Sequence, residues 1–120
     1  MGAQFLGIAG DILTIKVTGR LERAELEDVQ RSATAAIQKH GPVRILVLSE
    51  DFKGWAKGGD WGDLSFQIVN DASIRKMAVV SDEDWKDLVL MFTGQGLRNF
   101  PIEHFPPADE AKARTWLAAD

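Results

Sequence analysis

The chain has 120 residues, of which 45% are hydrophobic and 27% are charged, and these proportions are typical of one globular domain. Its formal net charge is −4 and it contains no run of lysine or arginine, which argues against nucleic acid as a partner. The absence of cysteine excludes disulfide bonds, thiolate chemistry, and zinc or iron–sulfur sites with cysteine ligands.

Membrane and export signals are missing from the sequence. No apolar stretch approaches the about 20 residues of a transmembrane helix, so we expect no membrane span. Residues 1–10 lack the basic region and the apolar core of a signal peptide, and we expect a cytoplasmic protein. An anionic membrane would not attract this acidic chain strongly, but peripheral contact through apolar side chains stays open.

The first third of the chain predicts a β-hairpin followed by a long helix. A short apolar run from Phe5 to Ile8 ends at the turn signal Gly10-Asp11, and apolar residues alternate over Ile12–Thr18. Apolar residues three or four apart then predict a helix that ends near His40, with acidic residues in its first half. Gly41-Pro42 terminates this helix.

The central strand is predicted at Val43–Leu48, which is apolar except for Arg44. A run of this kind, rich in β-branched residues, is typical of a strand that is buried on both faces. The next predicted elements are a helix from Asp60 to Asn70, a strand at Met77–Val80 and a helix from Asp82 to about Thr93. Ligands of open α/β sheets bind outside the carboxyl ends of the strands, so we expect any site beside the loop after the central strand.

The end of the chain predicts a short strand after Phe100 and a helix that opens at Pro106-Pro107. The expected order is therefore β-β-α-β-α-β-α-β-α. Alternating strands and helices favour an α/β fold with a mostly parallel central sheet, an N-terminal β-hairpin and about four helices. The sequence shows no linker or repeat, so residues 1–120 are expected to form a single domain.

Four segments are spread along nearly the whole chain: TGRLERAELEDV, VRILVLSEDFKGW, DWGDLSFQIVNDASIRKMAVVSDEDW and EAKARTWL. In these segments the sequence resembles the SpoIIAA-like family of small bacterial proteins, which is related to STAS domains. The strongest parts are FKGW after the central strand and AVVSDEDW at the start of the third helix. The resemblance implies a STAS-type sheet of about four or five strands with helices packed around it, and it includes no catalytic motif.

The resemblance does not carry over the phosphorylation switch of its STAS relatives. In the anti-sigma-factor antagonists among them, a serine at the start of the helix after the third strand is phosphorylated. The matching position here is Gly59-Asp60-Trp61, and no serine or threonine occurs from Glu50 to Leu64. SpoIIAA-like proteins are also similar in fold to lipid carriers of the CRAL-TRIO type, which implies binding of an apolar ligand or of a membrane surface.

Aromatic side chains gather around the predicted loop and the second and third helices. Aromatic residues on a loop after a strand pack the loop onto the sheet or line a pocket, and both interpretations stay open. The candidate ligand-binding residues, in a cleft between the second and third helices, are Phe52, Trp55, Trp61, Leu64, Trp85, Leu88 and Phe92. Leu90 and Met91 lie off the main apolar stripe of the third helix, so they are candidates for contact with the second helix, a partner subunit or lipid.

The histidines and acidic clusters give little support to catalysis or metal binding. His40 is expected to interact with the C-terminal end of a helix, where cations are favoured. His104 beside Glu103 is too sparse for a metal site, and a general-base role for it is the least favoured hypothesis. Ser81-Asp82 before two further acidic residues is a helix-capping signature, and the acidic residues 82–84 fit a charged first helical turn better than a metal site.

These observations favour a non-enzymatic domain that needs no cofactor and binds a small apolar ligand or a lipid. The main alternative is a protein-interaction module of the STAS type that acts as a homodimer or an adaptor through Leu90 and Met91. A hydrolase-like enzyme that uses His104 is a third and weaker hypothesis.

Overall fold

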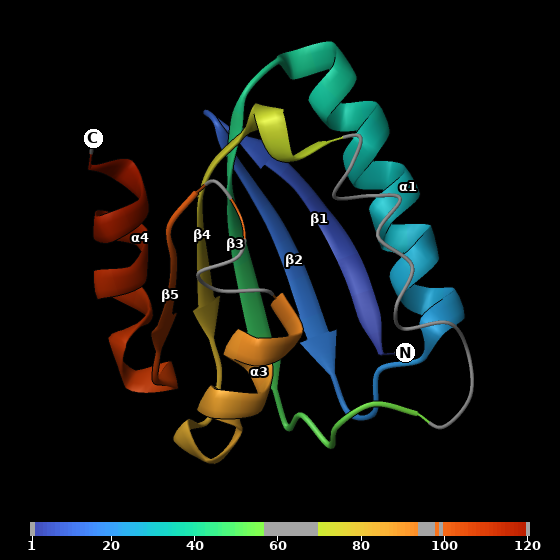
Figure 1. The fold of residues 1–120 in the computed structure, drawn as a ribbon, viewed down its shortest axis with the longest axis vertical. Coiled ribbons are helices and arrows are strands. Elements are labelled where there is room, and N and C mark those ends of the chain that lie inside the picture. Colours follow the sequence, from blue (N-terminus) through green and yellow to red (C-terminus); the bar gives the residue numbers. More distant parts are fainter. Residues whose placement is uncertain (1, 57–69, 94–97, 99, 120) are drawn as a thin grey trace.

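Five strands form one sheet whose spatial order, β1-β2-β3-β4-β5, equals the order of the strands in the sequence (Figure 1). The computed structural model describes residues 2–56, 70–93, 98 and 100–119. The strands are β1 (Ala3–Ala9), β2 (Ile12–Thr18), β3 (Val43–Glu50), β4 (Ile74–Val80) and β5 (Ile102–Phe105). The α-helices of the described residues are α1 (Arg23–His40), α3 (Lys86–Thr93) and α4 (Glu110–Ala118).

The first two strands form the predicted hairpin, and the rest of the sheet is parallel. Gly10 adopts a φ of 63° between β1 and β2, which a residue with a side chain rarely does. The register shifts between Phe5 and Gly7, so Leu6 forms a bulge on the outer edge of the sheet. A bulge disturbs the row of free backbone groups and makes this edge a poorer template for a further strand. The expected α/β fold is thus confirmed.

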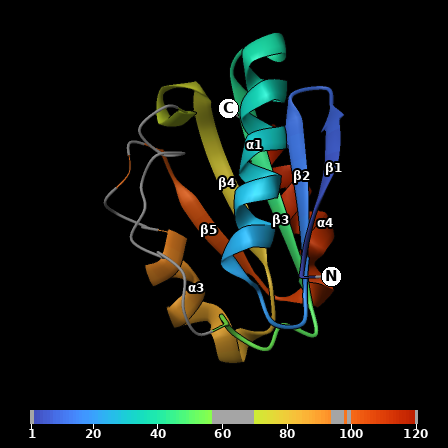
Figure 2. The same ribbon diagram turned by 90° about the vertical axis from the view of Figure 1, so that its right-hand side faces the viewer.

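The strand order determines which face each helix covers. Each parallel strand lies on the same side of the strand before it, so right-handed crossovers place α1 and α3 on one face of the sheet. Helix α4 follows the last strand and packs on the opposite face, against β3, β4 and β5 (Figure 2). The domain therefore has three layers with the sheet in the middle.

Each face of the sheet has its own hydrophobic core. Alternation along β3 explains the continuous apolar run in the sequence, because Ile45 faces α1 and α3 whereas Leu46 faces α4. The first core includes Leu13, Val17, Ala33, Ile37, Ile45, Met77, Val79 and Val89. The second core consists of Leu46, Ala78, Val80, Ala113 and Leu117.

Two cationic side chains of the sheet hold the C-terminal end of α4. The guanidinium of Arg44 on β3 donates to the carbonyls of Leu117 and Ala119, and its Nε lies 3.1 Å from a carboxylate oxygen of Asp11. Lys76 on β4 donates to the carbonyls of Trp116 (2.8 Å) and Ala119 (2.6 Å). The last carbonyls of a helix have no partner within it, so these donors satisfy groups that would otherwise need water.

The helix boundaries differ from the predicted ones in detail. The second predicted helix lies outside the described residues except at its end, so the structure describes three α-helices where about four were expected. The predicted third helix begins with a 3₁₀ turn at Glu83–Trp85 before α3. Its predicted cap is wrong, because Asp82 makes no side-chain cap bond and the Ser81 hydroxyl contacts His104 instead. The predicted C-terminal end of α1 is correct, and Gly41 caps it.

Candidate functional site

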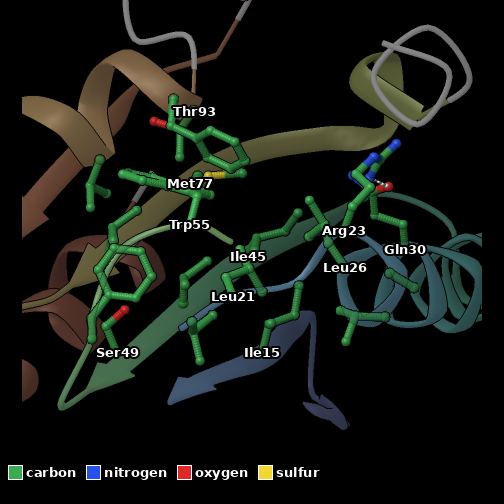
Figure 3. Close-up of a pocket in the computed structure, with 18 of the residues that line it drawn as sticks. Ile15, Leu21, Arg23, Leu26, Gln30, Ile45, Ser49, Trp55, Met77 and Thr93 are labelled. Atoms are coloured by element: carbon green, nitrogen blue, oxygen red, sulfur yellow. Dashed lines mark hydrogen bonds between the residues drawn. The ribbon is translucent and has the colours of Figure 1, made fainter. Parts of the chain in front are cut away.

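A cavity of about 190 Å³ lies on the face of the sheet that α1 and α3 cover (Figure 3). Its floor is formed by β2 from Ile15, by β3 from Ile45 and by β4 from Met77, and its walls by the first part of α1, by α3 and by the loop after β3. The apolar lining residues are Ile15, Val17, Leu21, Leu26, Val29, Ala33, Ile45, Val47, Phe52, Trp55, Met77, Val79, Val89 and Phe92. The cavity thus lies towards the carboxyl ends of the strands, where open α/β sheets bind ligands.

The side chains that form the floor of the cavity differ in exposure from their neighbours on the same strands. Leu13 and Ile45, deeper under α1, are fully covered. Ile15 and Val47, two residues further along the same strands, face the same side, line the cavity and stay partly exposed. Within the described part of the chain, the first core therefore leaves the apolar side chains of Ile15 and Val47 partly uncovered.

The loop after β3 is fixed by backbone hydrogen bonds to the connection between β2 and α1. Lys53 donates to the Gly19 carbonyl at 2.8 Å, and Leu21 donates to the Gly54 carbonyl at 2.9 Å. Leu21 and Trp55 form a parallel β-bridge, which continues the pairing of β2 with β3 beyond the sheet. The loop therefore holds its aromatic side chains in fixed positions.

Four aromatic rings pack together at one end of the cavity; we call Phe52, Trp55, Trp85 and Phe92 the aromatic cluster. The Phe52 ring lies 5.1 Å from that of Trp55 and 5.0 Å from that of Trp85, both edge to face. Such pairs add about 0.5–1.5 kcal/mol each to the burial of their surface. Gly54 has a φ of 93°, and a Cβ there would lie 3.2 Å from the Trp85 ring, so glycine suits this position.

The aromatic cluster contains a polar group without a partner. The indole nitrogen Nε1 of Trp55 is buried and makes no hydrogen bond within the part of the chain that the structure describes. A buried donor that lacks an acceptor costs about 1–3 kcal/mol relative to one that has an acceptor. Such groups are rare in folded proteins, and each calls for a physical reason.

Polar side chains lie at the edges of the cavity. Figure 3 shows Arg23 and Gln30 on one side, joined by a hydrogen bond of 3.4 Å, and Ser49 on the other. Arg98 also lines the cavity, but two of its nitrogens donate to the Asp71 carboxylate and a third donates to the Thr93 carbonyl. This bidentate pair ties the end of α3 to the start of β4 and so supports the cavity wall.

The predicted site residues fall into several groups. Phe52, Trp55 and Phe92 line the cavity, and Trp85 supports it through the aromatic cluster. Trp61 and Leu64 lie outside the described residues. The described cavity lies between α1 and α3, whereas the predicted cleft lay between the second and third helices.

The structure also shows how far the apolar residues of α3 are exposed. Leu90 is partly buried against the first core, and its contact with the second helix, a partner subunit or lipid stays a prediction. Met91 is 76% exposed and Leu88 is 47% exposed, and the predicted place of Leu88 in a cleft beside the second helix stays a prediction. A short helix that packs on one side turns Val89 and Leu90 inward and leaves Leu88 and Met91 outside.

A family model for SpoIIAA-like proteins matches residues 12–118. The chain belongs to the SpoIIAA-like family. Among solved structures, this SpoIIAA-like chain is similar to a protein of the DUF3478 family with a SpoIIAA-like fold from Shewanella loihica PV-4. The two share 16% sequence identity with a TM-score of 0.75, over 98% of this chain and 94% of that one, so the likeness concerns the fold. No curated protein matches the sequence.

The remaining candidate group of the SpoIIAA-like chain is His104, on β5. Its Nε2 lies 2.8 Å from the hydroxyl of Ser81, which follows β4 and is fully buried. Burial lowers the pKa of His104, and Lys86 lowers it further, against opposing contributions from the Ser81 and Asp82 backbone and from Glu83. A neutral imidazole beside a buried hydroxyl fixes the start of α3, but that hydroxyl is not accessible to a substrate.

The lowered pKa predicts a specific dependence of stability on pH. The folded state holds His104 neutral, so its contribution is complete above the unfolded pKa of about 6.5 and is lost as the pH falls through the folded pKa. The melting temperature should therefore fall more between about pH 7 and pH 5 in the wild type than in His104→Gln. Calorimetry at both pH values tests this, with His40→Gln as the control; parallel falls in wild type and His104→Gln would contradict it.

Two further features of the SpoIIAA-like chain concern its partners. Within the described ranges, no three histidine or acidic side chains lie together as a metal ion would need. None of the helices described here is both long enough and apolar enough to cross a membrane.

Proposed function

We propose that this SpoIIAA-like domain binds a small apolar ligand in the cavity between α1 and α3. The proposal rests on the apolar cavity at the carboxyl ends of β2, β3 and β4, where the floor residues Ile15 and Val47 are left partly uncovered. Monomeric proteins normally fill such space with side chains. A ligand in this position would complete the first core.

The size of the cavity limits the ligand. A cavity of about 150 Å³ holds one benzene molecule, whereas sites for drug-sized ligands measure about 300–1,000 Å³. The cavity of about 190 Å³ therefore suits a single ring with a short substituent or a short acyl segment. A whole lipid could place only the end of its chain there.

The lining residues support binding without catalysis. The ionisable side chains among the described lining residues are Arg23 and Arg98, and a guanidinium does not exchange protons near neutral pH. Ser49 also lines the cavity, but the Ser81–His104 pair does not. We therefore propose a non-enzymatic carrier or sensor without a cofactor, and we place its activity in the cytoplasm.

Two phenylalanine substitutions on neighbouring residues of β3 test the proposal. Val47→Phe should fill the cavity from its floor, whereas Leu48→Phe, on the opposite face, should leave it unchanged. Toluene at saturation should raise the melting temperature of the wild type and of Leu48→Phe by roughly 3–6 °C, and that of Val47→Phe by less than about 1 °C.

Native mass spectrometry of the freshly purified protein provides the second measurement. We expect an additional small mass that denaturation releases from the wild type and that is absent from Val47→Phe. The proposal fails if the wild type carries no such mass and its melting temperature does not respond to toluene.

The exposed side of α3 favours a second candidate function, which is protein interaction. Leu88 and Met91 are exposed, and Phe92 is 36% exposed beside them, so three apolar residues share one surface. If this surface joins two copies of the chain, sedimentation should show a dimer that Met91→Asp dissociates. Leu6→Asp, which changes an exposed leucine on β1, should leave the dimer intact. A wild-type monomer at all concentrations would contradict self-association.

A further inference from the structure

The unpartnered indole of Trp55 indicates what kind of ligand the cavity takes. Trp55 lines the cavity and also contacts the rings of Phe52, Trp85 and Phe92. Its Nε1 is covered by neighbouring atoms and has no hydrogen-bond partner among the described residues. The protein therefore holds a strong donor in an apolar setting without using it.

A hydrophobic ligand of pure hydrocarbon would leave this donor unsatisfied. A ligand with one acceptor oxygen on an apolar body would satisfy it and still match the apolar walls. Because neighbouring atoms cover the nitrogen, an acceptor reaches it only when the indole or an adjacent ring shifts. A hydrogen bond formed in an apolar site is strong because no water competes for it.

We propose that the ligand is a small, uncharged apolar molecule with a single carbonyl-type acceptor, and that the Trp55 N–H donates to this acceptor. This inference rests on the proposed function of the same cavity and names its ligand class. Ketones and esters of about one ring or a short chain belong to this class, whereas hydrocarbons of the same shape do not.

The test compares two probes of nearly equal shape on two proteins. Acetophenone carries a carbonyl oxygen where α-methylstyrene carries a methylene group, so the pair differs mainly in the acceptor. Trp55→Phe keeps an aromatic ring in the cluster and removes the N–H. Trp116→Phe is the matched control, because it removes an indole that packs on the opposite face of the sheet. Affinities are measured by titration calorimetry.

We expect the affinity for acetophenone relative to α-methylstyrene to be about tenfold higher in the wild type and in Trp116→Phe than in Trp55→Phe, where the ketone oxygen would be buried without a donor. The same ratio of affinities in Trp55→Phe as in the wild type would overturn the inference while leaving the proposed cavity function intact. No binding of either probe would count against the proposed function itself.

Nuclear magnetic resonance supplies a second measurement that does not depend on how Trp55→Phe folds. The indole N–H resonance of Trp55 in the wild type should move downfield on addition of acetophenone and move little with α-methylstyrene. A resonance that responds alike to both probes would contradict the hydrogen bond.

Discussion

Replacing Phe52 with alanine should lower the free energy of unfolding by about 3–5 kcal/mol, the usual range for removal of a buried phenylalanine. Phe52 is buried in the aromatic cluster, where it contacts the rings of both Trp55 and Trp85. Its removal eliminates two edge-to-face contacts at once. The loop after β3 and the start of α3 would then lose the side chain that joins them.

Urea unfolding followed by tryptophan fluorescence measures this loss. Phe105→Ala is the control, because Phe105 is only partly buried and contacts the single ring of Trp116 at 5.9 Å. We expect a loss of about 1–2 kcal/mol for this control. Phe52→Ala should also enlarge the cavity and accept bulkier hydrocarbons than toluene. A loss for Phe52→Ala no greater than that of the control would show that the cluster does not hold the loop.

Replacing Arg44 with methionine should lower the free energy of unfolding by about 2–4 kcal/mol. Arg44 is only 6% exposed, and its guanidinium donates to the carbonyls of Leu117 and Ala119 at the end of α4. Methionine retains much of the apolar stem but leaves these carbonyls without that donor. Asp11 is about half exposed and can be solvated by water, which keeps the loss below the upper limit for a fully buried pair.

The effect of Arg44→Met should be concentrated in α4. Lys76→Met is the comparison, because Lys76 contacts the same helix end from a more exposed position and should cost only about 1 kcal/mol. Hydrogen exchange should become faster at the backbone of α4 in Arg44→Met and remain unchanged in α1. Equal losses in the two variants would show that burial of the guanidinium adds nothing.

Much of the fold could be predicted from local patterns in the sequence. The alternation over Ile12–Thr18 identified β2, and the apolar run at Val43–Leu48 identified a strand covered on both faces, because each pattern has one simple structural solution. For Ser81, local sequence patterns did not predict the role of the side chain. Its position before an acidic turn suggested a cap, but β5 brings His104 within 2.8 Å of its hydroxyl, and this distant contact determines its role.

The location of the cavity was harder to predict than its aromatic members. Phe52 and Trp55 follow a buried strand, and this local signal marked them as candidates. The floor residues Ile15 and Val47 were read as ordinary core positions, because nothing in the alternation of a strand shows where the covering helices leave space. Residues of α1 line the cavity because of the way the helix packs across the sheet. This packing depends on the tertiary structure and cannot be seen in local sequence patterns.

The strand order also affects how the chain can fold during synthesis. Every strand after the first joins the edge left by the one before it, so the sheet can grow from β1 to β5 as the chain emerges from the ribosome. Helices α1 and α3 cover one side during this growth. The opposite side, with Leu46, Ala78 and Val80, stays uncovered until α4 emerges. Just before α4 is synthesised, the nascent chain therefore exposes an apolar, aggregation-prone face of the sheet. We expect a chaperone to bind the nascent chain at this face.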